Sequence, residues 1–119
     1  MRIALLLIAL FTSFFFYSCH HEDSSIEYPY KAEVRGLNSD CGLYEIKVLY
    51  GLSEIESIVG SSVIEGIYIA KNLPTELEIE GLIISLDIRA PKNNELGVCT
   101  LQGPTYKWLY VIRAIKNER

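Results

Sequence analysis

Few residues of this chain belong to the types that carry out nucleophilic or metal chemistry. The 119 residues include three cysteines and two histidines, and the histidines stand next to each other as His20 and His21. No histidine follows His21, so neither a Ser–His nor a Cys–His nucleophile can form in the rest of the chain. Adjacent histidines beside Glu22 and Asp23 are a weak metal motif, because a flexible segment seldom forms a closed site. We therefore predict no catalytic residue, no metal site and no cofactor.

Carboxylates are the remaining candidates for catalysis, since a pair of them would suit a small hydrolase. Glu76, Glu78 and Glu80 alternate with apolar residues, which is typical of a solvated face rather than of a catalytic pair. The sequence contains no Gly-rich phosphate loop and no dinucleotide fingerprint. We expect a protein that is not an enzyme, and a carboxylate-dependent hydrolase is the alternative.

Cys19 follows a segment with the features of an export signal. Arg2 precedes the apolar run Ile3–Leu10, which is shorter than the roughly 20 residues of a membrane-spanning helix but suits a signal-peptide core. Phe16-Tyr17-Ser18-Cys19 resembles the lipobox of bacterial lipoproteins, although Phe16 and Tyr17 are bulkier than usual. We predict a signal peptide over residues 1–18 and lipidation of Cys19. The alternatives are an uncleaved anchor helix and an ordinary cysteine near a cleavage site.

Residues 19–29 are predicted to form the lipidated start and a flexible tether. His20–Ser25 is polar and charged without an apolar period. A tether of this length reaches at most about 35 Å and averages about 18 Å, so the domain should lie near the membrane. Glu22 and Asp23 resemble the acidic export signal of surface lipoproteins of the Bacteroidota. That resemblance implies an outer-membrane lipoprotein of the cell envelope exposed at the cell surface, and a merely soluble linker is the alternative.

Cys41 and Cys99 remain once Cys19 is assigned to lipid. Both lie in turn-rich segments, and a secretory signal would place them in an oxidising compartment. We predict that they form a disulfide that ties the start of the second strand to the long loop before the last strand. The alternative is two buried free thiols.

Residues 30–119 are predicted to form one small β domain. Asn72–Leu77 is expected to form a short helical turn, whereas Leu52–Val59 is ambiguous between a helix and an irregular edge. The apolar residues change parity at Gly81, which indicates a break or a bulge. Apolar alternation and β-rich composition predict strands at Lys31–Arg35, Tyr44–Tyr50, Val63–Ala70, Leu82–Arg89 and Thr105–Lys116.

This order predicts an all-β fold, a small five-stranded OB-like Greek-key barrel with one short helical turn. An open β-sandwich is the alternative, but an open sheet would leave two adhesive edges. The last strand is apolar on both faces, so we expect it to be central or covered on both sides.

Tyr106, Trp108 and Tyr110 are the only positive indication of binding. A row of aromatic side chains can stack on sugar rings or anchor a protein partner. We favour the interpretation that they fill the core, because the domain has few other large residues.

Several short motifs resemble small lipoproteins of the Bacteroidota with a CG…NLP…GL pattern. The motifs are Cys41-Gly42, Tyr68–Pro74, Glu80–Ile84 and Cys99, within Cys41 to Lys116. The resemblance implies a barrel-like fold with a disulfide and implies no reaction. A net charge of −4 argues against a nucleic-acid partner. We expect a lipid-anchored binding or interaction module with an envelope protein or glycan as partner; a hydrolase and an inhibitor of secreted enzymes are the alternatives.

Overall fold

The computed structural model describes residues 27–100 and 102–117. The predicted signal peptide, Cys19 and most of the predicted tether lie outside these ranges. Within them, no helix is both long and apolar enough to cross a membrane. The strands are β1 (Tyr30–Asn38), β2 (Leu43–Tyr50), β3 (Ile67–Lys71), β4 (Ile83–Arg89) and β5 (Trp108–Lys116), with helix α2 (Leu52–Val59) and 3-10 helices η2 (Thr75–Leu77) and η3 (Asn93–Glu95).

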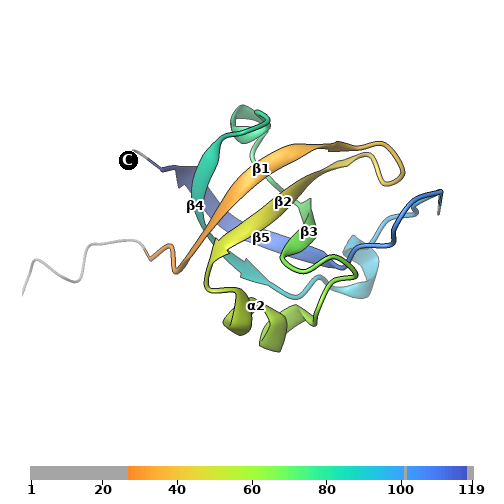
Figure 1. Cartoon of the computed structure of the whole chain (residues 1–119), viewed down its shortest axis with the longest axis horizontal. Helices are drawn as coiled ribbons and strands as arrows, with labels where there is room; N and C mark the ends of the chain where they lie inside the picture. The colour runs from red at the N-terminus through yellow and green to blue at the C-terminus, as the bar shows by residue number, and fades with distance from the viewer. Residues whose placement is uncertain (1–26, 101, 118–119) are drawn as a thin grey trace, which may run out of the picture.

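The five strands close into a barrel in the order β1-β2-β3-β5-β4, and β4 pairs back with β1 (Figure 1). Neighbouring strands are antiparallel except for β3 and β5, which pair in parallel from Ile69 to Lys71 of β3. This is the Greek-key arrangement of an OB-type barrel. The predicted five-stranded barrel is confirmed, and the open sandwich is excluded because the sheet closes on itself.

The core consists of alternate residues that the strands direct into the barrel. β1 contributes Tyr30, Ala32 and Val34, and β4 contributes Ile84, Leu86 and Ile88, all of them buried. The sequence of both strands alternates between apolar and polar residues in the same way, and this alternation makes the two strands predictable. η2 adds buried Leu77 to the core, in agreement with the predicted helical turn.

Several elements differ from their predicted bounds. β1 continues to Asn38 instead of ending at Arg35, and β5 begins at Trp108 instead of Thr105. Leu52–Val59, whose sequence fits either a helix or an irregular edge, is the α-helix α2, and its residue Ile55 is fully buried. The predicted strand Val63–Ala70 is too long at its start, because β3 begins only at Ile67 and the residues before it form a bend and a turn. Val63 and Ile64 are exposed, so their β-prone composition does not reflect a place in the sheet.

The last strand was expected to be central or covered on both sides, and the first of these holds: β5 pairs with β3 on one edge and with β4 on the other, but only one of its faces is buried. Leu109 and Val111 are buried in the barrel, whereas Ile112 and Ile115 are exposed. Ile88 pairs with Val111 and the next residue back, Asp87, pairs with Arg113, so Ile112 is an extra residue at a β-bulge. The bulge moves the inward-pointing positions along by one residue. Apolar residues therefore occur at both odd and even positions of β5, although only one of its faces is buried.

Candidate functional site

Tyr106, Trp108 and Tyr110 do not fill the barrel core. All three side chains are half-buried, and none belongs to the buried cluster inside the barrel. Leu109 points inward between Trp108 and Tyr110, so the two aromatic side chains point outward from β5. The interpretation that we favoured from the sequence is therefore wrong for this row.

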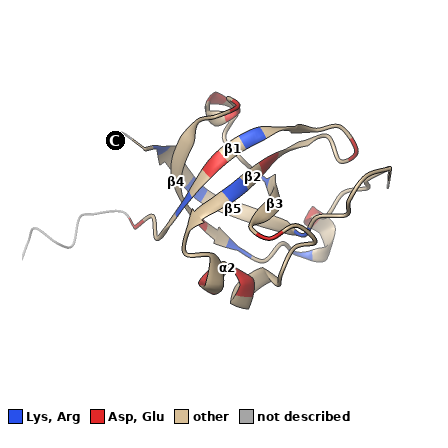
Figure 2. Cartoon of the chain, in the orientation of Figure 1, with Lys and Arg blue, Asp and Glu red and all other residues tan. Residues whose placement is uncertain are grey.

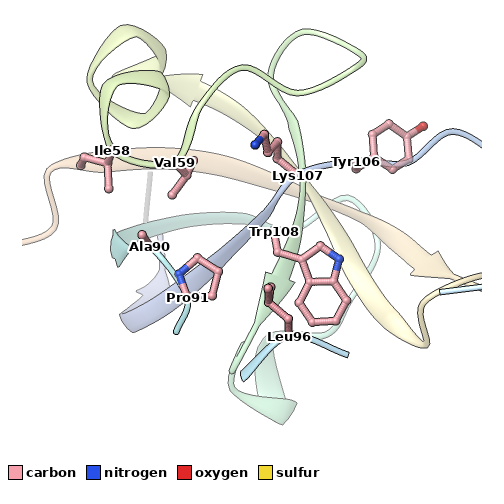
Figure 3. A pocket seen from close by; sticks show the side chains of 8 residues that line it. All are labelled: Ile58, Val59, Ala90, Pro91, Leu96, Tyr106, Lys107 and Trp108. Carbon is pink, nitrogen blue, oxygen red and sulfur yellow. The ribbon is translucent and has the colours of Figure 1, made fainter. Parts of the chain in front are cut away.

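A cleft of about 370 Å³ lies beside Trp108, between the C-terminal end of α2 and the β4–β5 loop. Figure 3 shows Val59 of α2 facing Pro91 and Leu96 of the loop across this space, with Trp108 beside them. The volume falls at the lower end of ordinary ligand sites, about 300–1,000 Å³. The walls are mostly apolar, with one charged residue, and consist of Ile58, Val59, Ala90, Pro91, Leu96, Tyr106, Lys107 and Trp108.

The sequence identified Tyr106 and Trp108 but missed the other walls of this cleft. Tyr110, the third predicted residue, does not line it. The helical spacing of Leu52, Ile55 and Val59 was the one available sign that α2 presents a face here. The loop residues gave no periodic signal.

Backbone hydrogen bonds fix the chain where it enters β5. The N–H of Ile69 donates to the carbonyl of Lys107 at 2.9 Å, and the N–H of Lys107 donates to Ser62 Oγ at 3.0 Å. Ile69 also pairs with Trp108 in the parallel register of β3 and β5. Burial and the charge of Glu45 raise the pKa of Tyr106, so its hydroxyl stays protonated and able to donate. These contacts give the aromatic wall of the cleft a fixed position.

One end of the β4–β5 loop is held by Arg89 and Glu95. The guanidinium donates two hydrogen bonds to the carboxylate, at 2.9 and 2.8 Å, and stands 3.7 Å from the centroid of the Tyr110 ring. The N–H of Lys92 also donates to Glu95 Oε1 at 2.7 Å. The Arg89 hydrogen bonds, followed by the backbone bond from Lys92, lower the pKa of Glu95 to about 2. Tyr110 therefore supports the cation that orients the loop.

The other end of the loop is tied to the turn between β1 and β2. The predicted Cys41–Cys99 disulfide is confirmed. Thr100 adds two hydrogen bonds to Asp40, from its N–H to the carbonyl at 2.9 Å and from Oγ1 to Oδ1 at 2.8 Å. Together these contacts join loops that are far apart in the sequence.

Gly97 lets the loop approach the indole of Trp108 closely. A Cβ at this position would lie 3.0 Å from Trp108 Cη2, a distance that real side chains seldom tolerate. The glycine thus places the loop against the edge of the ring while the cleft beside the ring remains open.

The described residues offer little for catalysis or metal binding. Across residues 27–100 and 102–117, no group of three or more His, Cys, Asp or Glu side chains is placed to hold a metal ion. Glu76 and Glu80 are exposed and Glu78 is half-buried, and Glu95 is engaged with Arg89. Figure 2 shows charges of both signs interspersed along β1 and β2. No carboxylate is among the described residues that line the cleft beside Trp108.

Comparison with known proteins gives no match to a family model, to a curated protein or to a solved structure. The most specific features are the half-buried Trp108 and the single cation, Lys107, among apolar walls.

Proposed function

We propose that this protein is a non-enzymatic, lipid-anchored binding module of the cell envelope that holds a protein partner in the cleft beside Trp108. The observation that carries the proposal is the cleft itself, an open apolar space on the outside of a closed barrel. Half-buried tryptophan and tyrosine side chains contribute strongly to binding in protein interfaces. A barrel whose core is already filled by other residues leaves these aromatic groups available for a partner.

The composition of the walls favours a polypeptide over a glycan. Sugar hydroxyl groups need several hydrogen-bond partners, but most of the lining residues are aliphatic. The polar side-chain groups at the cleft are those of Tyr106, Lys107 and Trp108. Apolar side chains of a protein partner would match such walls better than a sugar ring would.

The anchoring part of the proposal is supported by the N-terminal sequence. Ser18-Cys19 after a short apolar segment suits lipoprotein processing, and several acyl chains give stable attachment, at about 0.8 kcal/mol per buried CH₂. The acidic residues Glu22 and Asp23 favour the outer face of the outer membrane. Mass spectrometry of the mature chain should find Cys19 as the first residue with lipid on its sulfur and amine. An unmodified Cys19 would remove the anchor.

The binding proposal is tested by photo-crosslinking in the cells that make the protein. A photoreactive phenylalanine analogue replaces Leu96 at the cleft or, as a matched control, Leu49 on β2; both side chains are 49 % exposed. We expect an adduct at position 96 that proteinase K removes, and no adduct at position 49. A proteinase-resistant, glycan-containing adduct would identify a sugar partner instead, and equal labelling at both positions would contradict a specific site.

A further inference from the structure

The β4–β5 loop contains a segment without regular secondary structure that is attached at both ends. We call Leu96–Cys99 the strap. It follows the Arg89–Glu95 ion pair and ends at the Cys41–Cys99 disulfide. Leu96 has extended backbone angles, with φ −80° and ψ 138°. The strap is therefore fixed in space although it belongs to no strand of the barrel.

The backbone of the strap has unused hydrogen-bonding groups. The N–H of Leu96 donates weakly to the carbonyl of Asn93, at 3.4 Å. The N–H groups of Gly97, Val98 and Cys99 make no hydrogen bond within the part of the chain that the structure describes. An exposed extended segment with free N–H and C=O groups is a template for pairing with another strand.

The side chains of the strap are also suited to a partner. Val98 is 92 % exposed, the highest value among the large apolar residues outside the core, and Leu96 is 49 % exposed at the rim of the cleft. Gly97 lies against Trp108, as its short distance to the ring shows. The strap thus combines an open backbone with apolar side chains directly beside the aromatic wall.

The positive charge at the cleft favours a partner that carries a negative charge. Lys107 is exposed, lines the cleft and has no ion-pair partner among the described residues. A carboxylate on the partner would complement this ammonium group, and no acidic residue lines the cleft to compete with it. A partner whose apolar side chain is followed or preceded by an acidic residue would therefore fit the cleft better than a partner with a basic residue at that position.

We propose that the strap recognises an extended polypeptide by β-strand addition, with an apolar partner side chain in the cleft beside Trp108 and a partner carboxylate near Lys107. The inference rests on the proposed binding function and names its mode and the chemistry of its ligand. Strand addition takes its affinity from main-chain hydrogen bonds and its specificity from pockets for alternate side chains. Because both ends of the strap are already fixed, little conformational entropy is lost when the partner pairs with it.

The first test uses a phage-displayed library of random peptides, selected on the full-length lipidated chain in detergent. We expect selected peptides to combine alternating apolar residues with an acidic residue. Trp108 is the only tryptophan of the chain, so a tryptophan-free synthetic peptide that enters the cleft should change its fluorescence emission. N-methylation of the peptide backbone at every second position should weaken binding about tenfold, because each methyl group removes a donor to the strap.

Variants of the protein test the side-chain contacts. Lys107→Gln should weaken binding of the acidic peptide about twofold to fivefold, whereas Lys47→Gln on the outside of β2 should leave it unchanged. Val98→Ala should also weaken binding, and Val63→Ala, at another exposed valine, should not. Circular dichroism of each variant checks that the barrel is folded.

The outcomes separate the mode of binding from the binding function. A loss of affinity at alternate N-methylated positions supports strand addition. Equal tolerance of N-methylation at every position overturns it, even where Trp108 responds to the peptide. A Trp108 response to envelope glycan fragments without any selected peptide overturns the peptide proposal and keeps a binding cleft. No Trp108 response and no crosslink at position 96 overturn both.

Discussion

A single step along β5 separates the core of the barrel from the cleft. Leu109 is fully buried inside, while the preceding residue, Trp108, is half-buried outside. The sequence alone could not assign the two faces, because both carry large apolar residues and a bulge at Ile112 changes their parity. At this scale, side-chain direction rather than hydrophobicity decides which residue packs and which is available to a partner.

Gly51 is a second residue whose role depends on its backbone. It precedes α2 with φ +90°, and a Cβ there would overlap Cδ1 of the buried Tyr30. We predict that Gly51→Ala lowers the free energy of unfolding by about 3 kcal/mol, through left-handed strain and overpacking. Urea denaturation followed by circular dichroism measures this loss.

Gly42→Ala is the control for the Gly51 variant. Gly42 also has a positive φ, +74°, but a Cβ there would meet nothing within 4 Å. Gly42→Ala should lower the free energy of unfolding by only about 1 kcal/mol, because it adds only the cost of the left-handed backbone conformation. Equal losses in the two variants would mean that the contact with Tyr30 contributes nothing.

Among the elements, those with a strict period were predictable and those held by distant contacts were not. β1 and β4 followed from alternation, and α2 remained open because eight residues contain only two turns of helical pattern. The sequence between β4 and β5 predicts a loop but not the path of that loop. Its path depends on the Asp40–Thr100 and Arg89–Glu95 contacts, the first of which joins residues 60 positions apart. Such pairings leave no local signature in a sequence.

The Arg89–Glu95 pair predicts how the loop responds to acid. The carboxyl of Glu95 has its pKa lowered from 4.5 to about 2 in the folded protein. The unfolded chain binds the proton more readily, so the pair stabilises the fold above the unfolded pKa and loses that effect as the pH falls through the folded one. Glu95→Gln should therefore be less stable than the natural chain at neutral pH, and the difference should shrink between about pH 4.5 and pH 2.

Urea denaturation of both chains across this pH range measures the effect. Glu80→Gln is a suitable control, because Glu80 is exposed and makes no ion pair within the described residues. A stability difference for Glu95→Gln that does not change with pH would contradict a role for the ionised pair.

For the whole molecule, closure and cross-linking were predictable, but the cleft was not. Five short strands of this size need closure to avoid free edges, and two leftover cysteines suggested a bridge. The cleft combines Ile58 and Val59, the loop from Ala90 to Leu96, and the start of β5. These three segments meet only because the barrel order places β3 beside β5 and β5 beside β4.

The barrel also separates the cross-linked loops from the point where the chain enters it. β1 starts at Tyr30 and runs about 26 Å, at about 3.3 Å per residue, to the β1–β2 turn on the opposite side of Figure 1. In a lipid-anchored chain, the disulfide and the strap would then lie away from the tether. That placement would leave the strap accessible to a partner.

The disulfide should therefore affect the stability of the whole domain as well as the geometry of the strap. It joins residues 58 positions apart, and a loop of that size restricts the unfolded chain by about 4 kcal/mol in the chain-entropy model. We predict that the double variant Cys41→Ala and Cys99→Ala loses about this much free energy of unfolding. In the folded variant, the loop keeps the Arg89–Glu95 contact at one end but only the Thr100–Asp40 hydrogen bonds at the other, so Trp108 emission should shift toward that of a solvent-exposed indole. Urea denaturation and fluorescence measure both effects, and the natural chain treated with a reductant should reproduce them.

Two other outcomes would change this interpretation of the disulfide. Unchanged stability with a shifted Trp108 spectrum would mean that the disulfide only positions the strap. An unchanged Trp108 spectrum in the folded variant would contradict its role in holding the strap.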